Sequence, residues 1–310
     1  MGIFDLLKKS DFNKGVELFE SGYFAEALEA YDRSLARRPR HVDAWNNRGA
    51  ALSSLGMYQE AIVSYDRALA LDPGHLLAWN NRGNALESLG RYDEALASYD
   101  RALAINPRHA DSWNNRGYAL ISLGRHEDAI ESLDRAVALD ERFTLAYVNR
   151  GFALDACGRH EEAIVSYDRA LSIEPRYVDA WSLRASSLFS LGRYEDTIDS
   201  CDRAIAIYHN FCHPWYIRGC SLDALGQHED AVAAWETVIG FHPETRFHWY
   251  YRGLALARLC RNREAIEAFE EARAMLRLRI LDPSDEEIQK AKVNITGEDG
   301  ASHRRKAPIR

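Results

Sequence analysis

Residues 76–109 read LLAWNNRGNALESLGRYDEALASYDRALAINPRH, and the pattern of this stretch returns every 34 residues along the 310-residue chain. An arginine-glycine pair marks the period. This pair stands at Arg48-Gly49, Arg82-Gly83, Arg116-Gly117, Arg150-Gly151, Arg218-Gly219 and Arg252-Gly253. A strict period of this length predicts a stack of similar structural repeats, each of which contacts chiefly its neighbours.

Each repeat has the pattern of a helical hairpin. Positions are numbered 1 to 34 from the first residue of each repeat. The eight repeats cover residues 8–41, 42–75, 76–109, 110–143, 144–177, 178–211, 212–245 and 246–279. A glycine at position 15, such as Gly90, is expected to end the first helix, and a proline at position 32, such as Pro107, to close the second. Between these residues Trp79, Leu86 and Ala95 recur at helical spacing, so the sequence predicts an all-α protein.

The stretch from Ala78 to Leu86, followed by residues 92–95 and 102–107, closely resembles the signature of the tetratricopeptide repeat family. The resemblance extends over residues 8–279. It implies a right-handed superhelical solenoid of antiparallel helix pairs, in which the first helices line a concave groove. Position 7 departs from the family pattern, because it is basic in this chain where the family more often has leucine.

The segment after the repeats is expected to cover the end of the solenoid. Ser284 and Glu287 have the spacing of a capping box, so residues 280–296 are predicted to contain a capping helix. Residues 297–310 are basic and contain glycine, serine and proline, and they are predicted to be a disordered tail.

A charge pair recurs in every repeat, because position 7 is basic and position 25 is acidic in all eight copies. In the third repeat these residues are Arg82 and Asp100. We predict a salt bridge either between the two helices of one repeat or across the joint to the next repeat. An exposed pair contributes only ~0.2–1 kcal/mol, so its role is register rather than strength.

The resemblance assigns positions 2, 5, 6, 9, 12 and 13 to the concave groove. Position 6 carries a series of asparagines, namely Asn13, Asn47, Asn81, Asn115 and Asn149. An asparagine amide can both donate to and accept from a peptide backbone, whatever the side chains of the peptide. A similar series lines the repeats of O-linked N-acetylglucosamine transferase, whose catalytic domain has no counterpart here. The alternative interpretation is that these asparagines order the helix and satisfy neighbouring backbone groups.

The other expected groove residues change in character along the chain. Positions 5 and 9 of the first five repeats add polar and aromatic groups: Asn80, Asn84, Asn114, Tyr118 and Phe152. From the sixth repeat onward the expected groove residues are aromatic: Phe189, Tyr216, Phe247, Tyr250 and Tyr251. An extended partner could therefore place its backbone along the asparagines and anchor an apolar segment near the C-terminal repeats.

We therefore expect a non-enzymatic scaffold or adaptor that binds an extended or helical peptide segment of a protein partner. The alternative is a structural component that associates with copies of itself into a homo-oligomer. Positions 5 and 9 carry no lysine or arginine, so recognition of a chaperone tail by a carboxylate clamp is not expected.

Chemistry of other kinds has little support in the sequence. His209, Cys212, His213 and Cys220 lie close together, but their spacing fits no established zinc site, and we expect neither a metal nor a cofactor. The net charge of −8 argues against nucleic acid. No apolar stretch approaches the ~20 residues of a membrane helix. The cytoplasm is the expected compartment.

The sixth repeat departs most from the shared pattern, at Ala185, Thr197, Cys201 and His209. Stability in repeat arrays is close to a sum over neighbouring repeats, so this repeat is expected to be the least stable.

Overall fold

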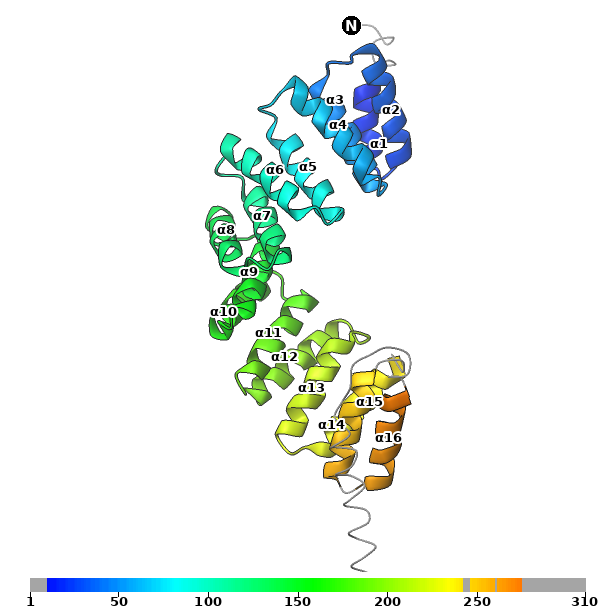
Figure 1. Ribbon diagram of the computed structural model, residues 1–310, viewed down its shortest axis with the longest axis vertical. Coiled ribbons are helices and arrows are strands. Elements are labelled where there is room, and N and C mark those ends of the chain that lie inside the picture. Colours follow the sequence, from blue (N-terminus) through cyan, green and yellow to red (C-terminus); the bar gives the residue numbers. More distant parts are fainter. Residues whose placement is uncertain (1–9, 242–245, 260, 275–310) are drawn as a thin grey trace, which may run out of the picture. The chain divides into compact units, whose positions relative to one another are not determined.

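The computed structural model describes residues 10–241, 246–259 and 261–274, and these residues form helices and short turns (Figure 1). The predicted capping helix within 280–296 and the tail of 297–310 lie outside the described residues, as does the side chain of Phe247. Contacts divide the chain into two compact units, residues 1–159 and residues 160–310, called here the N-terminal and the C-terminal unit.

The helices of the N-terminal unit are α1 (Asp11–Glu20), α2 (Phe24–Arg37), α3 (Val42–Ser54), α4 (Tyr58–Leu71), α5 (Leu76–Ser88), α6 (Tyr92–Ile105), α7 (Ala110–Ser122), α8 (His126–Leu139) and α9 (Thr144–Ala156). Those of the C-terminal unit are α10 (His160–Ile173), α11 (Val178–Ser190), α12 (Tyr194–Ile207), α13 (Cys212–Ala224), α14 (His228–Phe241), α15 (Arg246–Arg258) and α16 (Asn262–Ala274). Within each unit every helix packs against the next one along the chain, and first helices also contact first helices of neighbouring repeats. The predicted hairpin stack is thus confirmed in both units.

The turn inside each hairpin depends on the glycine at position 15. Gly90 has a φ of 72°, a left-handed conformation that other residues adopt at a cost. This conformation lets the N–H of Arg91 donate to the carbonyl of Leu86 at 2.9 Å, which ends α5 and starts the next helix two residues after the glycine. Where position 32 is a proline, the second helix ends shortly before it: α4 ends at Leu71, two residues before Pro73.

Small residues let the two helices of a hairpin approach closely. A Cβ atom built on Gly83 of α5 would overlap the ring of Tyr99 on α6, and one built on Gly219 of α13 would lie 2.5 Å from Nε1 of Trp235 on α14. Tyr99 and Trp235 are fully buried. The glycine at position 8 and the large side chain at position 24 therefore fill one space together.

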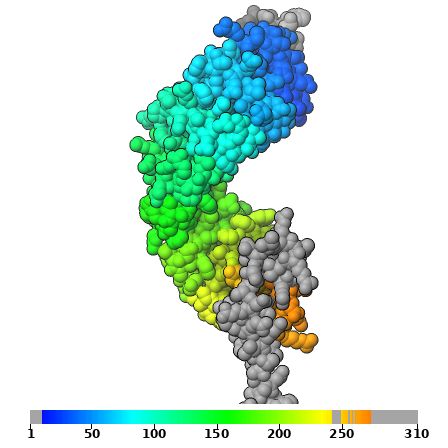
Figure 2. Space-filling view, viewed as in Figure 1, coloured from blue at the N-terminus to red at the C-terminus, as the bar shows by residue number. Residues whose placement is uncertain are grey.

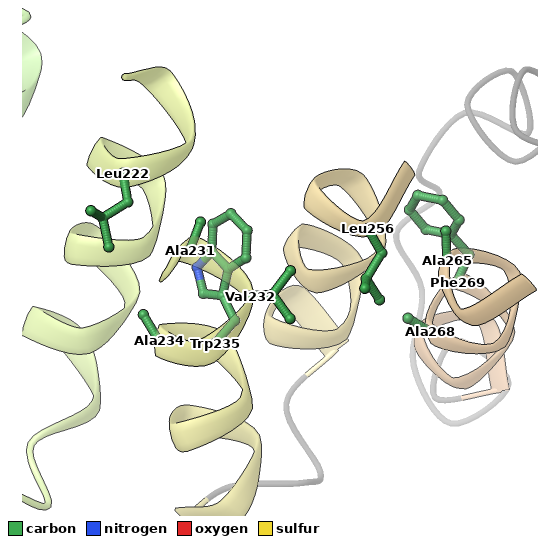
Figure 3. Close-up of a cluster of buried hydrophobic side chains, with 9 residues drawn as sticks. All are labelled: Leu222, Ala231, Val232, Ala234, Trp235, Leu256, Ala265, Ala268 and Phe269. Atoms are coloured by element: carbon green, nitrogen blue, oxygen red, sulfur yellow. The ribbon is translucent and has the colours of Figure 1, made fainter. Parts of the chain in front are cut away.

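The apolar core runs from hairpin to hairpin within a unit. In the C-terminal unit a single cluster includes residues of four successive helices, α13 to α16 (Figure 3). Its members are Leu222, Ala231, Val232, Ala234, Trp235, Leu256, Ala265, Ala268 and Phe269. In the N-terminal unit, Figure 2 shows that side chains fill the spaces between neighbouring hairpins. No hairpin buries its apolar face alone, so the stability of each depends on its neighbours.

The recurring charge pair lies across the joints between repeats. Nε of Arg82 in the third repeat lies 2.7 Å from Oδ1 of Asp66 in the second, rather than near Asp100 of its own repeat. The same joint contact joins Arg48 to Asp32, Arg116 to Asp100, Arg150 to Asp134, Arg184 to Asp168, Arg218 to Asp202 and Arg252 to Glu236. Of the two predicted pairings, the one across the joint is therefore confirmed.

Several of these arginines, Arg82 among them, also bind their own repeat. Nη1 of Arg82 donates to Oγ of Ser98 at 2.8 Å, and its guanidinium carbon lies 6.0 Å from the ring centroid of Trp79. The indole N–H of Trp79 in turn donates to the carbonyl of Pro73 in the preceding repeat at 2.9 Å. The arginine and the tryptophan together fix the register of two consecutive hairpins.

Candidate functional site

The asparagines at position 6 donate hydrogen bonds across the joints of the N-terminal unit. Nδ2 of Asn81 donates to Oδ1 of Asn46 at 3.1 Å, and Nδ2 of Asn149 donates to Oδ1 of Asn114 at 2.9 Å. Nδ2 of Asn115 donates to Oδ1 of Asn80 at 3.3 Å. Each bond runs from position 6 of one repeat to position 5 of the preceding repeat. The amides thus form a network between the repeats.

This network changes the expected roles of the asparagines at position 5. Asn80 and Asn114 were expected in the open groove, but both are buried, with exposed fractions of 6% and 3%. Each accepts a hydrogen bond from the position-6 asparagine of the next repeat, Asn115 for Asn80 and Asn149 for Asn114. Their amides serve the joint, so we correct their assignment to the groove surface.

The outer asparagines are only partly available to a partner. Asn115 uses its amide nitrogen on Asn80 and also on Asn84, whose Oδ1 lies 3.0 Å away. Its Oδ1 accepts from Nδ2 of Asn114 at 3.1 Å. The sequence left open that these asparagines serve the protein's own structure and not a partner. The hydrogen bonds agree with that role, but they join neighbouring side-chain amides and not backbone groups. Asn13 and Asn84 are exposed, and Asn47, Asn81, Asn115 and Asn149 are half-buried.

A small pocket of about 180 Å³ lies beside the asparagines, with lining residues on α1, α3, α4 and α5. Asn81 and Asn84 line it together with hydroxyl groups, including those of Ser53 and Tyr65. These two hydroxyl oxygens lie 3.3 Å apart, and burial raises the pKa of Tyr65 to about 12. The pocket is therefore neutral and rich in hydrogen-bonding groups.

Glu87 is a residue near this pocket that the sequence did not single out. It stands at position 12 of α5 and is half-buried, and burial raises its pKa from 4.5 to about 7. The hydroxyl of Tyr99 lies 3.1 Å from Oε2 of Glu87 and 2.8 Å from Oδ1 of Asn84, and it donates to these oxygens. Burial also raises the pKa of Tyr99, so the tyrosine remains a neutral donor. Glu87 could have been found from the sequence, because position 12 is one of the positions that the family resemblance assigns to the groove.

Two exposed aromatic residues continue this face toward the end of the N-terminal unit. Tyr118 on α7 and Phe152 on α9 share position 9 with Asn84, and their exposed fractions are 43% and 44%. Large apolar side chains exposed at one position of two adjacent first helices offer a partner an apolar contact.

A larger pocket lies in the C-terminal unit, between the first helices α11, α13 and α15. It has a volume of about 550 Å³, within the range of ligand pockets in proteins. Its lining includes Phe189 of α11, Tyr216 of α13 and Tyr251 of α15. The structure thus brings three of the five aromatic residues expected in the C-terminal repeats to one pocket.

The rings of Tyr216 and Tyr251 form one corner of this pocket. Their centroids lie 5.2 Å apart and their planes are inclined by 71°, an edge-to-face arrangement. Tyr250 does not line the pocket, since its ring lies 5.8 Å from that of Phe269 and packs against the core. Tyr250 shares position 5 with the buried Asn80 and Asn114, but it also shares it with Tyr216, which does line the pocket.

Polar groups also line this pocket. Oδ1 of Asp223, at position 12 of α13, accepts from Nδ1 of His228 at 2.7 Å. Cys220 also contributes to the lining, and burial raises the pKa of its thiol to about 11, so the sulfur is a neutral group. Burial likewise raises the pKa of Tyr216.

The histidines and cysteines considered for zinc have separate roles in the structure. The ring of His209 packs edge to face on Trp215 at 5.4 Å, and Nδ1 of His213 lies 2.7 Å from Oγ of Ser182. Among residues 10–241, 246–259 and 261–274, no three side chains of the metal-binding types form a group. In the same part of the chain no helix is long and apolar enough to cross a bilayer.

Comparisons with known proteins agree with these repeats. Two models of the tetratricopeptide repeat match the chain, one at residues 42–75 and 144–177 and the other at residues 80–142 and 216–283. No curated protein gives a match.

Solved structures share the fold. The structure of YrrB, a tetratricopeptide repeat protein with an unusual peptide-binding site, is 25% identical, covers 60% of this chain and 96% of its own, and superposes with a TM-score of 0.52. A tetratricopeptide repeat protein from Parabacteroides merdae is 20% identical over 79% of this chain and 97% of its own, with a TM-score of 0.58. PilW, a type IV pilus biogenesis factor, is 22% identical over 66% and 94%, with a TM-score of 0.60. The family matches extend over more than half of the sequence, and the chain belongs to the tetratricopeptide repeat family.

Proposed function

We propose that this protein is a non-enzymatic scaffold that binds an extended or helical peptide segment of a partner protein along its first helices. The observation that carries this proposal is the pocket of about 550 Å³ in the C-terminal unit, whose walls include Phe189, Tyr216 and Tyr251. Aromatic side chains in a concave surface supply large contact areas for an anchor residue of a partner. The similarity to YrrB, which has a peptide-binding site, supports the same function.

The N-terminal unit by itself offers a more polar surface for a peptide segment. Exposed or half-buried amides at Asn81 and Asn84 and the exposed rings of Tyr118 and Phe152 are the groups that a peptide would contact there. Each hydrogen bond contributes only about 0.5–1.5 kcal/mol net, so several of these groups must act together to bind a peptide.

Selection of random peptides displayed on phage against the full-length chain tests the proposal. We expect selected peptides to bind with dissociation constants in the micromolar range, about −8 kcal/mol of binding free energy. The exposed Ala224 lines the pocket at position 13 of α13, and Ala224→Trp would fill the space that an anchor residue needs. This variant should weaken the selected peptides about tenfold or more.

Ala156→Trp is the matched control. Ala156 is also exposed and stands at position 13 of its repeat, but it belongs to α9 of the N-terminal unit. If no peptide is selected, or if selected peptides bind the Ala224→Trp and Ala156→Trp proteins equally well, the pocket is not the anchor site. Light scattering over a range of concentrations separates peptide binding from self-association of the chain.

A further inference from the structure

The small pocket of the N-terminal unit and the aromatic pocket of the C-terminal unit use the same positions of their repeats. Positions 9, 12, 13 and 17 of one repeat contribute to each pocket, together with position 12 of the preceding repeat and positions 6 and 9 of the following one. The 34-residue pattern therefore builds one kind of pocket in both units. The side chains at these positions decide what each pocket can hold.

The pocket of the N-terminal unit, called here the amide pocket, has an uncharged lining. Three serines, two tyrosines, two asparagines, two alanines and Phe19 line it. Ser53 and Tyr58 occupy the positions at which the C-terminal pocket has Asp223 and His228. An ionised group that left water for the amide pocket would find no opposite charge among the described lining residues, so an uncharged occupant is favoured.

The two asparagines of the amide pocket present opposite ends of their amides to a ligand. Oδ1 of Asn84 accepts from the hydroxyl of Tyr99 at 2.8 Å and from Nδ2 of Asn115 at 3.0 Å. Among the described residues, Nδ2 of Asn84 is thus the end left to bind. Nδ2 of Asn81 donates to Oδ1 of Asn46 at 3.1 Å, which leaves Oδ1 of Asn81 as an acceptor.

This donor and this acceptor belong to neighbouring side chains. Asn81 and Asn84 stand three residues apart on α5, so they share one face of the helix. Hydroxyl groups add further bonding capacity, since Oγ of Ser88 donates to the carbonyl of Asn84 at 3.0 Å and can still accept. A ligand group that both donates and accepts, without charge, therefore matches the amide pocket.

A primary carboxamide has these properties, because it carries a carbonyl acceptor and two N–H donors in one neutral group. Glutamine and asparagine bring it at the end of a side chain. The volume of about 180 Å³ is smaller than that of pockets for drug-sized ligands and suits a single side chain.

We propose that the amide pocket binds the carboxamide of a glutamine or asparagine side chain of the partner segment, which accepts from Asn84 and donates to Asn81. This inference rests on the proposed function and adds the chemistry of one residue that the N-terminal unit recognises. Loss of one such hydrogen bond should weaken binding about two- to tenfold.

The first test uses three probes of similar length, the N-acetyl methylamides of glutamine, glutamate and methionine. Their binding to the full-length protein is measured at neutral pH by titration with saturation-transfer NMR. We expect the glutamine probe to bind at least about threefold more tightly than the other two, because glutamate brings an unpaired charge and methionine lacks the amide hydrogen bonds. A glutamate or methionine probe that binds as tightly as the glutamine probe would overturn the inference.

Two variants locate the binding of the glutamine probe. Ser54 is exposed and lines the amide pocket at position 13 of α3, so Ser54→Trp should fill the pocket and abolish the preference for glutamine. Ala156→Trp is the matched control, because Ala156 is exposed at the same position of its repeat and lines neither pocket. The preference should persist in this control.

Asn84→Ala removes the proposed donor without adding a charge, and it should weaken the glutamine probe about two- to tenfold. Gln59→Ala is its control, since it removes an exposed amide of α4 that lies outside the lining. An unchanged preference for glutamine in Ser54→Trp and in Asn84→Ala would contradict the proposed site.

Peptides selected as described above separate this inference from the proposed function. If replacement of a glutamine or asparagine by methionine weakens a selected peptide about threefold in the original protein but not in Ser54→Trp, both hold. If peptides lose affinity in Ala224→Trp and none in Ser54→Trp, the scaffold function holds and the carboxamide inference is wrong. If no peptide is selected but the glutamine probe binds in the amide pocket, the scaffold function fails while the carboxamide site stands.

Discussion

Ala185 on α11 and Cys201 on α12 share one buried cluster, at two positions where most repeats have a glycine and a large side chain. In the second repeat the partners are Gly49 and Tyr65, and a Cβ atom on the glycine would lie 2.5 Å from the ring. In the sixth repeat Ala185 adds a methyl group where other repeats have glycine, and Cys201 is smaller than the aromatic or leucine side chain that it replaces. The two departures from the pattern compensate each other in volume.

This compensation predicts a strong dependence between the two sites. Cys201→Tyr alone should lower the free energy of unfolding by about 1–3 kcal/mol, because the new ring meets the Cβ of Ala185. The double variant with Ala185→Gly should recover most of this loss. Urea unfolding followed by circular dichroism measures both. A Cys201→Tyr protein as stable as the original, or a double variant no better than the single one, would contradict the compensation.

The amide network predicts that the asparagines of positions 5 and 6 differ in their importance for stability. Asn114→Ala removes the acceptor of Asn149 and the donor to Asn115 in a buried setting, so it should cost about 1–3 kcal/mol of unfolding free energy. Asn13→Ala changes an exposed side chain and should stay within about 0.5 kcal/mol. Thermal unfolding of the two variants compares them. Equal effects would mean that the network contributes nothing.

The contacts at the joints predict that replacing the arginine of an ion pair lowers the free energy of unfolding more than replacing its acidic partner. Asp100→Ala removes a contact of 2.8 Å to Arg116 from a carboxylate that is 57% exposed, and it should cost only about 0.2–1 kcal/mol. Arg116→Ala should cost more, because it also removes the bond to Ser132 at 2.6 Å and the contact with the Trp113 ring. Arg125→Ala, which removes an exposed ion pair within one helical turn, is the control. We expect the unfolding free energy to fall most in Arg116→Ala. A loss in Arg116→Ala no larger than that in Asp100→Ala or Arg125→Ala would contradict the prediction.

Glu87 predicts a loss of stability as the pH rises. Its pKa is raised from 4.5 to about 7 in the folded protein, so its contribution to stability is complete below pH 4.5 and is lost as the pH rises through 7. A shift of this size corresponds to at most roughly 3 kcal/mol. The stability of Glu87→Gln relative to the original protein should therefore increase over this interval, measured by urea unfolding at several pH values.

Glu94→Gln is the control for this prediction, because it has the opposite sign. Arg91 lowers the pKa of Glu94 through hydrogen bonds to the carboxylate, so its contribution to stability is lost as the pH falls. A Glu87→Gln protein whose stability follows that of the original protein at every pH would show that the carboxylate is well solvated.

The hairpins could be predicted from the sequence because the signals for them are local. A glycine such as Gly90 ends a helix through its own backbone conformation, and the 34-residue period places every such turn. The partners at the joints could not be chosen, because each repeat carries both charges. Arg82 could pair with Asp66 or with Asp100 until the distance between repeats was known.

The candidate site was harder to predict for a similar reason. Whether an asparagine faces a partner or a neighbouring asparagine depends on the distance between first helices, which the sequence does not state. Asn80 and Asn114 were therefore assigned to the groove although they are buried. Ala185 and Cys201 were counted as two separate weaknesses of the sixth repeat, because their shared space is visible only in three dimensions. Low stability of that repeat remains a prediction that hydrogen exchange can test.

The joints have a consequence for the length of the array. Every interface in the N-terminal unit is built from an acidic residue of the earlier hairpin and an arginine of the later one. Excision of residues 76–109 would bring Asp66 opposite Arg116 with the same chemistry as before. The gene for such a protein can gain or lose whole copies of the motif by in-frame recombination, and the shortened or lengthened product keeps compatible junctions.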